Sequence, residues 1–218
     1  MLKIVVICAL LLGALGCQGY SVTGGAGPIV TPHLVTTSET PRELVGINSI
    51  LVAPPQFAEA ARGSAPNQSM LYGLLTDAAD EELDLKLISG TEVLKRFESA
   101  ASSDSQAKQL RLAKEMHLDG LLLTTFNQYE ERQGSKVGTN IPAAVSFRMK
   151  LLRVADGAEL WSGSYYFKDQ ALSENLFRIK DKLTEKSGPQ WRNAPELARQ
   201  GFKSAMSDLG SKRLQQFS

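Results

Sequence analysis

The most specific chemical signal in this 218-residue sequence is the thiol of Cys17, which follows a short apolar segment. Lys3 gives the chain a positive start, and residues 4–15 form an almost unbroken apolar run. As a helix this run would span about 18 Å, well short of the roughly 30 Å hydrocarbon core of a bilayer. The run is therefore typical of the apolar region of a signal peptide, and not of a membrane-spanning helix.

The segment Ala14-Leu15-Gly16-Cys17 resembles the lipobox of bacterial lipoproteins. The resemblance implies that the Cys17 thiol receives a diacylglyceryl group and becomes the mature N-terminus after residues 1–16 are removed. Gln18 stands where an Asp retains many lipoproteins in the inner membrane, so the sorting rule implies an outer-membrane anchor that faces the periplasm. Two or three acyl chains hold firmly because each buried CH₂ contributes about 0.8 kcal/mol. An ordinary secretory signal is the alternative.

Composition and charge exclude several classes of protein. The chain carries 24 Lys and Arg against 23 Asp and Glu, so nothing in its net charge of +1 favours binding to nucleic acid. Two Cys and two His are too few for the usual zinc cage in one chain. If Cys8 leaves with the signal peptide and Cys17 is acylated, no thiol remains for a thiol enzyme.

Other residues with chemical potential have simpler interpretations. His33 lies in a Gly- and Pro-rich segment, and His117 ends a predicted helix, where a donor suits the last carbonyls. The acidic residues between 80 and 84 could bind a cation, but neighbouring helix residues point in different directions, so we expect a solvated helix end. No nucleophile elbow or phosphate loop occurs in the predicted domain. We therefore predict no catalytic residue, no metal, no cofactor and no enzymatic activity.

The chain divides into three parts. Residues 1–16 are the predicted signal peptide, and residues 17–45 combine the lipidated N-terminus with a segment rich in Gly, Pro, Ser and Thr. A flexible chain of about 28 residues has a root-mean-square span of about 30 Å. Residues 46–218 are predicted to form a single α/β domain behind this tether.

The first half of the predicted domain alternates short strands with helices. Residues 47–53 read as a buried strand that ends at Pro54-Pro55, and residues 70–83 have the apolar spacing of a helix. A second strand is predicted over 85–88. Possible capping boxes at Ser89 and Ser103 each precede a further helix, and residues 121–129 form the next strand.

The second half predicts an antiparallel meander followed by two helices. Apolar and polar residues alternate over 145–151, Asp156-Gly157 is a tight-turn signal, and residues 160–167 return as the partner strand. Helices are predicted over 172–183 and after a capping box that begins at Asn193. We expect Trp161, Tyr165 and Phe167 to pack beneath these helices. The predicted fold is a mixed α/β (α+β) sheet with helices packed on it.

These features resemble a known group of periplasmic lipoprotein domains. The resemblance rests on the strand that ends in Pro-Pro, on Asp119-Gly120-Leu121, and on the meander that ends at Asp156-Gly157-Ala158-Glu159-Leu160-Trp161-Ser162-Gly163. The group contains the curli-secretion lipoprotein, the second type of penicillin-binding-protein activator and the N-terminal domain of the Tol-system propeller protein. It implies the fold and an envelope location, and no functional residue transfers from it.

The expected function is that of a non-catalytic interaction or assembly module in the bacterial cell envelope. A sheet edge or the polar loop over Glu130–Pro142 is expected to contact an unidentified envelope protein, because loops on a rigid scaffold often carry such contacts. The polar loop residues proposed for this contact are Glu130, Arg132, Lys136 and Asn140. One alternative is a subunit of an oligomeric secretion or envelope complex, and another is an envelope hydrolase; the sequence leaves the oligomeric state open.

Overall fold

The computed structural model describes residues 32–38, 41–59, 61, 67–90, 93, 95–96, 105–134, 139–169 and 192–215. The predicted signal peptide, Cys17, Lys136 and the helix predicted over 172–183 lie outside these ranges. Within the described ranges, no helix combines the length and the apolar composition that crossing a membrane requires.

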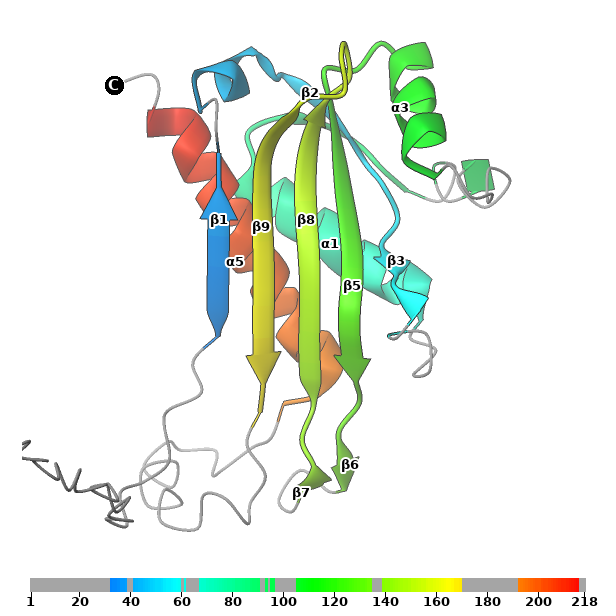
Figure 1. Ribbon diagram of the computed structural model, residues 1–218, viewed down its shortest axis with the longest axis vertical. Helices are drawn as coiled ribbons and strands as arrows, with labels where there is room; N and C mark the ends of the chain where they lie inside the picture. The colour runs from blue at the N-terminus through cyan, green and yellow to red at the C-terminus, as the bar shows by residue number, and fades with distance from the viewer. Residues whose placement is uncertain are drawn as a thin grey trace, which may run out of the picture.

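An open mixed sheet of seven strands forms the centre of the described domain (Figure 1). The strand order is β1-β9-β8-β5-β2-β4, and β3 pairs with β5 off this path. The strands are β1 (His33–Thr37), β2 (Ser49–Val52), β3 (Gln56–Phe57), β4 (Lys86–Ile88), β5 (Gly120–Glu130), β8 (Ala144–Arg153) and β9 (Glu159–Lys168). The helices packed on the sheet are α1 (Gln68–Glu82), α3 (Ser105–Glu115) and α5 (Ala194–Leu214). The predicted fold class and single domain are confirmed.

Strands β5, β8 and β9 form the long antiparallel meander of the sheet. The buried residues of β8 alternate with more exposed ones, as expected for a strand with one covered face. Phe147 of β8 lies opposite Tyr165 of β9, and their rings stack with centroids 5.1 Å apart. Gly157 in the turn between these strands has φ 77°, a conformation that glycine adopts without a Cβ clash. The predicted hairpin over residues 145–167 is therefore confirmed.

Strand β2, at the centre of the parallel half, is buried on both faces. β2 lies between β4 and β5 and runs parallel to both. Ile50, Leu51 and Val52 are completely buried, which explains why this strand reads as a continuous apolar run. The strand ends before Pro54-Pro55, as predicted.

Helices α1 and α5 cover one face of the sheet and lie behind it in Figure 1. The predicted capping box of α5 is present: the Asn193 side chain accepts from the Glu196 N–H, and the Glu196 carboxylate accepts from the Asn193 N–H, both at 2.9 Å. Phe202 of α5 then packs on Phe147 with ring centroids 4.9 Å apart. The capping box therefore starts the helix that closes the core.

Three of the four aromatic side chains of β9 pack beneath α5, as predicted. Trp161, Tyr165 and Phe167 are buried. The Tyr165 ring lies so close to Gly201 of α5 that a Cβ added at Gly201 would stand 2.7 Å from it. The Arg192 guanidinium lies 4.5 Å from the centroid of the Phe167 ring. These contacts favour a core role for the three aromatics, and not a surface platform.

Helix α3 lies on the opposite face, beside β5. Gln106 and Gln109 of α3 line a small cavity of about 150 Å³ together with Arg148 and Lys150, which alternate with the buried residues of β8. Of the short helix predicted after Ser89, the described residues 93, 95 and 96 are helical.

The predicted tether over residues 17–45 is wrong at its C-terminal end. β1 pairs antiparallel with β9, and a 3-10 helix, η1 (Pro41–Gly46), follows it. His33 therefore belongs to an edge strand and is exposed there. The strand escaped prediction because it is short and its hydrogen-bonding partner lies far along the chain. The folded part thus begins well before residue 46.

Candidate functional site

The segment predicted as an interaction loop is partly a β-ribbon. β6 (Gln133–Gly134) and β7 (Thr139–Ile141) pair antiparallel and carry the β5–β8 hairpin beyond the end of the main sheet (Figure 1). The prediction of a polar loop over Glu130–Pro142 is wrong for the residues of β6 and β7, which form strands. Backbone pairing needs no apolar side chains, so the polar composition concealed the ribbon.

The predicted contact residues are distributed along this ribbon. Glu130 is the last residue of β5, and its carboxylate accepts a hydrogen bond of 2.8 Å from the Gln128 side chain. Arg132 lies between β5 and β6, and Asn140 lies in β7. Sequence reasoning did not select Ile141, an apolar side chain that is 44% exposed.

The ribbon is anchored in the core by Tyr129. The Tyr129 hydroxyl donates a hydrogen bond of 3.0 Å to the exposed Glu131 carboxylate, while its ring meets Phe126 edge-on. Burial of the phenol, reinforced by the Glu131 charge, raises the pKa of Tyr129. The neutral phenol therefore fixes the base of the ribbon against the sheet.

The N-terminal chain reaches the sheet at the ribbon end. His33 of β1 lies opposite Tyr166, Tyr166 lies opposite Ser146, and Ser146 lies opposite Gln128. These pairs form one row across the sheet, close to where β5 continues into the ribbon. The start of β1 and the base of the ribbon thus share one end of the domain (Figure 1).

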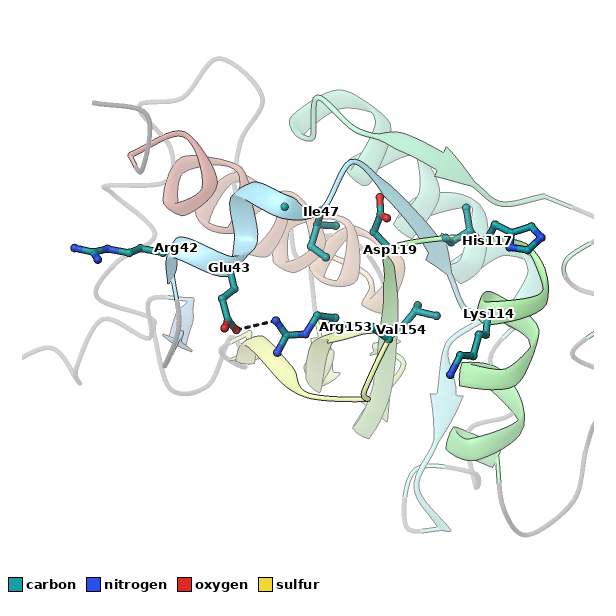
Figure 2. Close-up of a pocket in the computed structure, with 11 residues that line it drawn as sticks. Arg42, Glu43, Ile47, Lys114, His117, Asp119, Arg153 and Val154 are labelled. Carbon is teal, nitrogen blue, oxygen red and sulfur yellow. Dashed lines mark ion pairs between the residues drawn. The ribbon is translucent and has the colours of Figure 1, made fainter.

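A cavity of about 510 Å³ opens at the opposite end of the sheet (Figure 2). It lies where β2 and β5 begin and β8 ends, between η1 and the last turn of α3. Ile47, Leu118 and Val154 line it with aliphatic side chains that are themselves buried. The cavity therefore has an apolar floor.

Charged side chains surround this floor. Figure 2 shows Arg42 extending outward from η1 at one end and Lys114 on α3 at the other. Between them, a nitrogen of the Arg153 guanidinium lies 3.2 Å from the Glu43 carboxylate. Arg42 and Lys114 form no ion pair with any other residue in the described part of the chain.

Asp119 also borders the cavity, but its carboxylate is engaged in the fold. Its Oδ2 atom accepts hydrogen bonds from the Asn48 N–H at 3.0 Å, the Ser49 N–H at 3.0 Å and the Ser49 hydroxyl at 2.8 Å. Desolvation by burial opposes ionisation, yet these three bonds outweigh it and lower the pKa of Asp119. Asp119 is thus an ionised structural residue that joins β2 to β5.

His117 has a backbone conformation that side-chain-bearing residues rarely adopt, with φ 54°. Its N–H donates to the Lys114 carbonyl, and the Leu118 N–H donates to the Ala113 carbonyl, both at 3.1 Å. This pair of bonds defines a helix C-terminus at which glycine is usual. A non-glycine residue there costs about 1–2 kcal/mol. The prediction that His117 ends a helix is confirmed, and its strained backbone is an additional finding.

The acidic residues at the end of α1 do not form a metal site. Lys203 of α5 lies 3.0 Å from the Glu81 carboxylate and 3.6 Å from that of Glu82. Across the described ranges, no group of three or more His, Cys, Asp and Glu side chains is arranged to hold a metal ion. These carboxylates instead help to join α1 to α5 at the surface.

Neither a family model nor a curated protein matches this chain, but solved structures resemble it. The PelC dodecamer from Paraburkholderia phytofirmans aligns at 15% identity over 82% of this chain and 97% of that one, with a TM-score of 0.47. Lipoprotein GNA1162 from Neisseria meningitidis aligns at 20% identity over 56% of this chain and 83% of that one, with a TM-score of 0.43. The LpoB C-terminal domain from Escherichia coli aligns at 15% identity over 59% of this chain and 95% of that one, with a TM-score of 0.41.

These neighbours include a lipoprotein. At such identities and TM-scores the likeness is one of overall chain path. It transfers no ligand, partner, assembly or residue role to this chain.

Proposed function

We propose that this protein is a lipid-anchored assembly module of the bacterial cell envelope. Residues 1–16 direct export, and acylated Cys17 holds the chain in the outer membrane with its domain in the periplasm. The domain acts without catalysis, by presenting the β6–β7 ribbon to another envelope protein. The lipobox-like segment supports the anchor, and the sheet register supports the choice of the ribbon.

The observation that carries this proposal is the row of pairs from His33 to Gln128. Because β1 starts at the ribbon end, an anchor at Cys17 attaches to the domain beside the ribbon. Only about 16 residues separate Cys17 from His33. A Gly-rich chain of that length has a root-mean-square span of about 20–24 Å. The ribbon is therefore held close to the membrane surface, within reach of proteins embedded there.

The ribbon offers two features to a protein partner. Ile141 provides an exposed apolar side chain, and Glu131 and Gln133 are exposed polar residues close to it along the hairpin. Among the described strands, β6 and β7 pair only with each other, so their outer backbone edges are open. An extended partner segment can add to such an edge through main-chain hydrogen bonds.

Site-specific photo-crosslinking in cells tests the ribbon contact. A photoreactive residue at Gln133 or Ile141 is expected to give one discrete crosslinked species, whereas the same residue at Asp80 on the exposed side of α1 is expected to give none. Crosslinks from Asp80 alone, or none from either ribbon position, would refute the ribbon contact.

Labelling with radioactive palmitate tests the anchor separately. The wild-type protein is expected to carry label, and Cys17→Ser is expected to lose it. An unlabelled wild-type protein would overturn the anchor and the proposed location. Because the two readouts are independent, failure of the ribbon contact and failure of the anchor can be told apart.

A second candidate function is that of a subunit in an oligomeric envelope complex. It is favoured by β1, which ends the strand order and pairs on only one side with a described strand, β9. Light scattering on the detergent-purified protein tests this candidate. A strict monomer at high concentration would exclude self-assembly through that edge.

A further inference from the structure

We infer that the cavity between η1 and α3 binds an acidic peptide segment that inserts one apolar side chain. The site lies at the end of the sheet away from the ribbon, so it is a second interaction surface and does not depend on the ribbon contact. Three observations support it: the apolar floor, the pattern of engaged and free charges, and the strained residue beside it.

The floor suits one side chain. Ile47, Leu118 and Val154 present aliphatic groups to a space of about 510 Å³, within the range of ligand pockets in proteins. A leucine or phenylalanine side chain fits such a floor and leaves its own backbone at the rim. A fatty acyl chain needs a longer apolar groove than three aliphatic residues provide. The floor therefore favours a peptide over a lipid.

The charges favour an acidic ligand. The two nearest carboxylates are already engaged: Glu43 by Arg153, and Asp119 by backbone and hydroxyl donors of β2. Arg42 and Lys114 remain without an ion pair among the described residues. A carboxylate brought to the rim therefore meets two cations that no acid in the described part of the chain pairs with.

The positions of these cations favour an extended ligand. Arg42 lies at the η1 end and Lys114 at the α3 end of the cavity, with the Arg153–Glu43 pair between them (Figure 2). A segment with acidic residues on both sides of one apolar residue reaches both cations while its centre occupies the floor. A compact anion could meet only one of them.

His117 lies at the α3 end of the cavity. It lines the cavity from a backbone position where glycine would be more stable, so its side chain has a cost that the fold itself does not require. Strain of this kind is concentrated at functional sites. The exposed imidazole points outward at this end of the cavity (Figure 2), where a ligand that extends past the rim can meet it.

Fluorescence anisotropy with synthetic peptides tests the ligand class on the full-length, detergent-purified protein. The probe is a fluorescein-labelled peptide with a central Leu or Phe between Asp and Glu residues. We expect it to bind at least tenfold tighter than the same peptide with Lys in place of its acids, or with Ser in place of its apolar residue. Binding is expected to weaken as salt is raised, because the rim cations are exposed.

Matched variants test the location. The double variant Arg42→Glu with Lys114→Glu is expected to weaken binding at least tenfold, and Lys168→Glu, an exposed lysine at the other end of the sheet, is expected to leave it unchanged. Thermal unfolding verifies that each variant is folded. The milder pair Arg42→Gln with Lys114→Gln serves if the charge reversal disturbs folding.

His117→Gly separates binding from folding. Removing the strain is expected to raise Tm by about 2–4 °C, while loss of the imidazole weakens peptide binding. If His117 had only a structural role, the substitution would raise Tm and leave peptide binding unchanged. The inference is overturned if the Glu double variant binds the acidic peptide as tightly as Lys168→Glu does. It is also overturned if the Lys peptide binds as tightly as the acidic peptide, or if no acidic peptide binds at millimolar concentration. Binding only to phosphatidylglycerol vesicles overturns it as well.

Discussion

The indole N–H of Trp161 donates a hydrogen bond of 3.0 Å to Oδ2 of Asp208, and the same oxygen lies 3.0 Å from Nζ of Lys212. This link joins β9 to α5 on the covered face of the sheet. Trp161 is completely buried in the folded domain, and the Asp208 carboxylate accepts the hydrogen bond from its N–H. The position of α5 on the sheet is thus set by a polar contact as well as by apolar packing.

Removing this carboxylate is expected to destabilise the domain. Asp208→Ala leaves the buried indole donor unpaired, and we expect the free energy of unfolding to fall by about 1–3 kcal/mol. Urea titration followed by circular dichroism measures it. Asp80→Ala, an exposed position on α1, is the control and is expected to change stability by less than about 0.5 kcal/mol. Equal losses in both variants would contradict the role of the link.

Two glycine substitutions are expected to act in opposite directions. A Cβ at Gly201 would stand 2.7 Å from the rings of Phe147 and Tyr165, so Gly201→Ala should cost about 1–3 kcal/mol by overpacking. Gly73 in α1 has nothing within 4 Å of its added Cβ, so Gly73→Ala should stabilise by about 0.5–1 kcal/mol. Chemical denaturation of both variants checks the signs, and a stable Gly201→Ala would argue against the close packing of α5.

Two buried tyrosines are expected to respond differently to loss of their hydroxyls. The Tyr72 hydroxyl donates to the Val52 carbonyl at 3.0 Å and accepts from the Gly90 N–H at 3.1 Å, so Tyr72→Phe should cost about 1–3 kcal/mol. The buried Tyr165 hydroxyl has no hydrogen-bond partner among the described residues. Tyr165→Phe is therefore expected to be neutral or stabilising.

A pH titration of Tyr165 gives an independent check. Burial raises the pKa of Tyr165 to about 12, although the Arg192 charge opposes the shift. Since the neutral phenol is the folded form, the wild-type protein is expected to lose stability as pH rises above about 10, the ordinary pKa of tyrosine. Tyr165→Phe should lose less over the same range, and an identical loss in both proteins would contradict the shift.

Asp119 is expected to make stability depend on acid pH. Its pKa is lowered in the folded protein, so its contribution is present above about pH 4 and is lost as pH falls through the folded value. Asp119→Asn should be less stable than the wild type at pH 7, and the difference should shrink on acidification, because a protonated Asp and an Asn carry the same charge. Urea unfolding at several pH values measures this. A constant difference would contradict it.

The parts of the fold that local chemistry specifies could be predicted from the sequence. The alternation in β8, the Asp156-Gly157 turn and the Asn193 capping box each act over a few residues, and each is present in the structure. β1 could not be predicted in this way, since His33 pairs with Tyr166, a residue far along the sequence that no local pattern links to it. The β6–β7 ribbon was hidden for a related reason, because its pairing extends a neighbouring hairpin and needs no apolar pattern.

The cavity between η1 and α3 could not be predicted from local sequence patterns. Arg42, Lys114 and Arg153 belong to η1, α3 and β8, and only the assembled sheet brings them to one end. His117 was recognised as a helix terminus, but its positive φ carries no signature in the neighbouring sequence. The sequence therefore predicts the sheet, its helices and the anchor hypothesis, but it does not predict the cavity between η1 and α3.

The antiparallel pairing of β1 with β9 has a mechanical consequence. A pull on the chain before His33, away from the domain, acts along the axis of β1, so it loads the hydrogen bonds between the two strands in shear. Bonds loaded in shear must yield together, whereas bonds peeled from one end yield in turn. Tension that reached the domain from a lipid anchor of the kind proposed would therefore be shared among all the hydrogen bonds between β1 and β9.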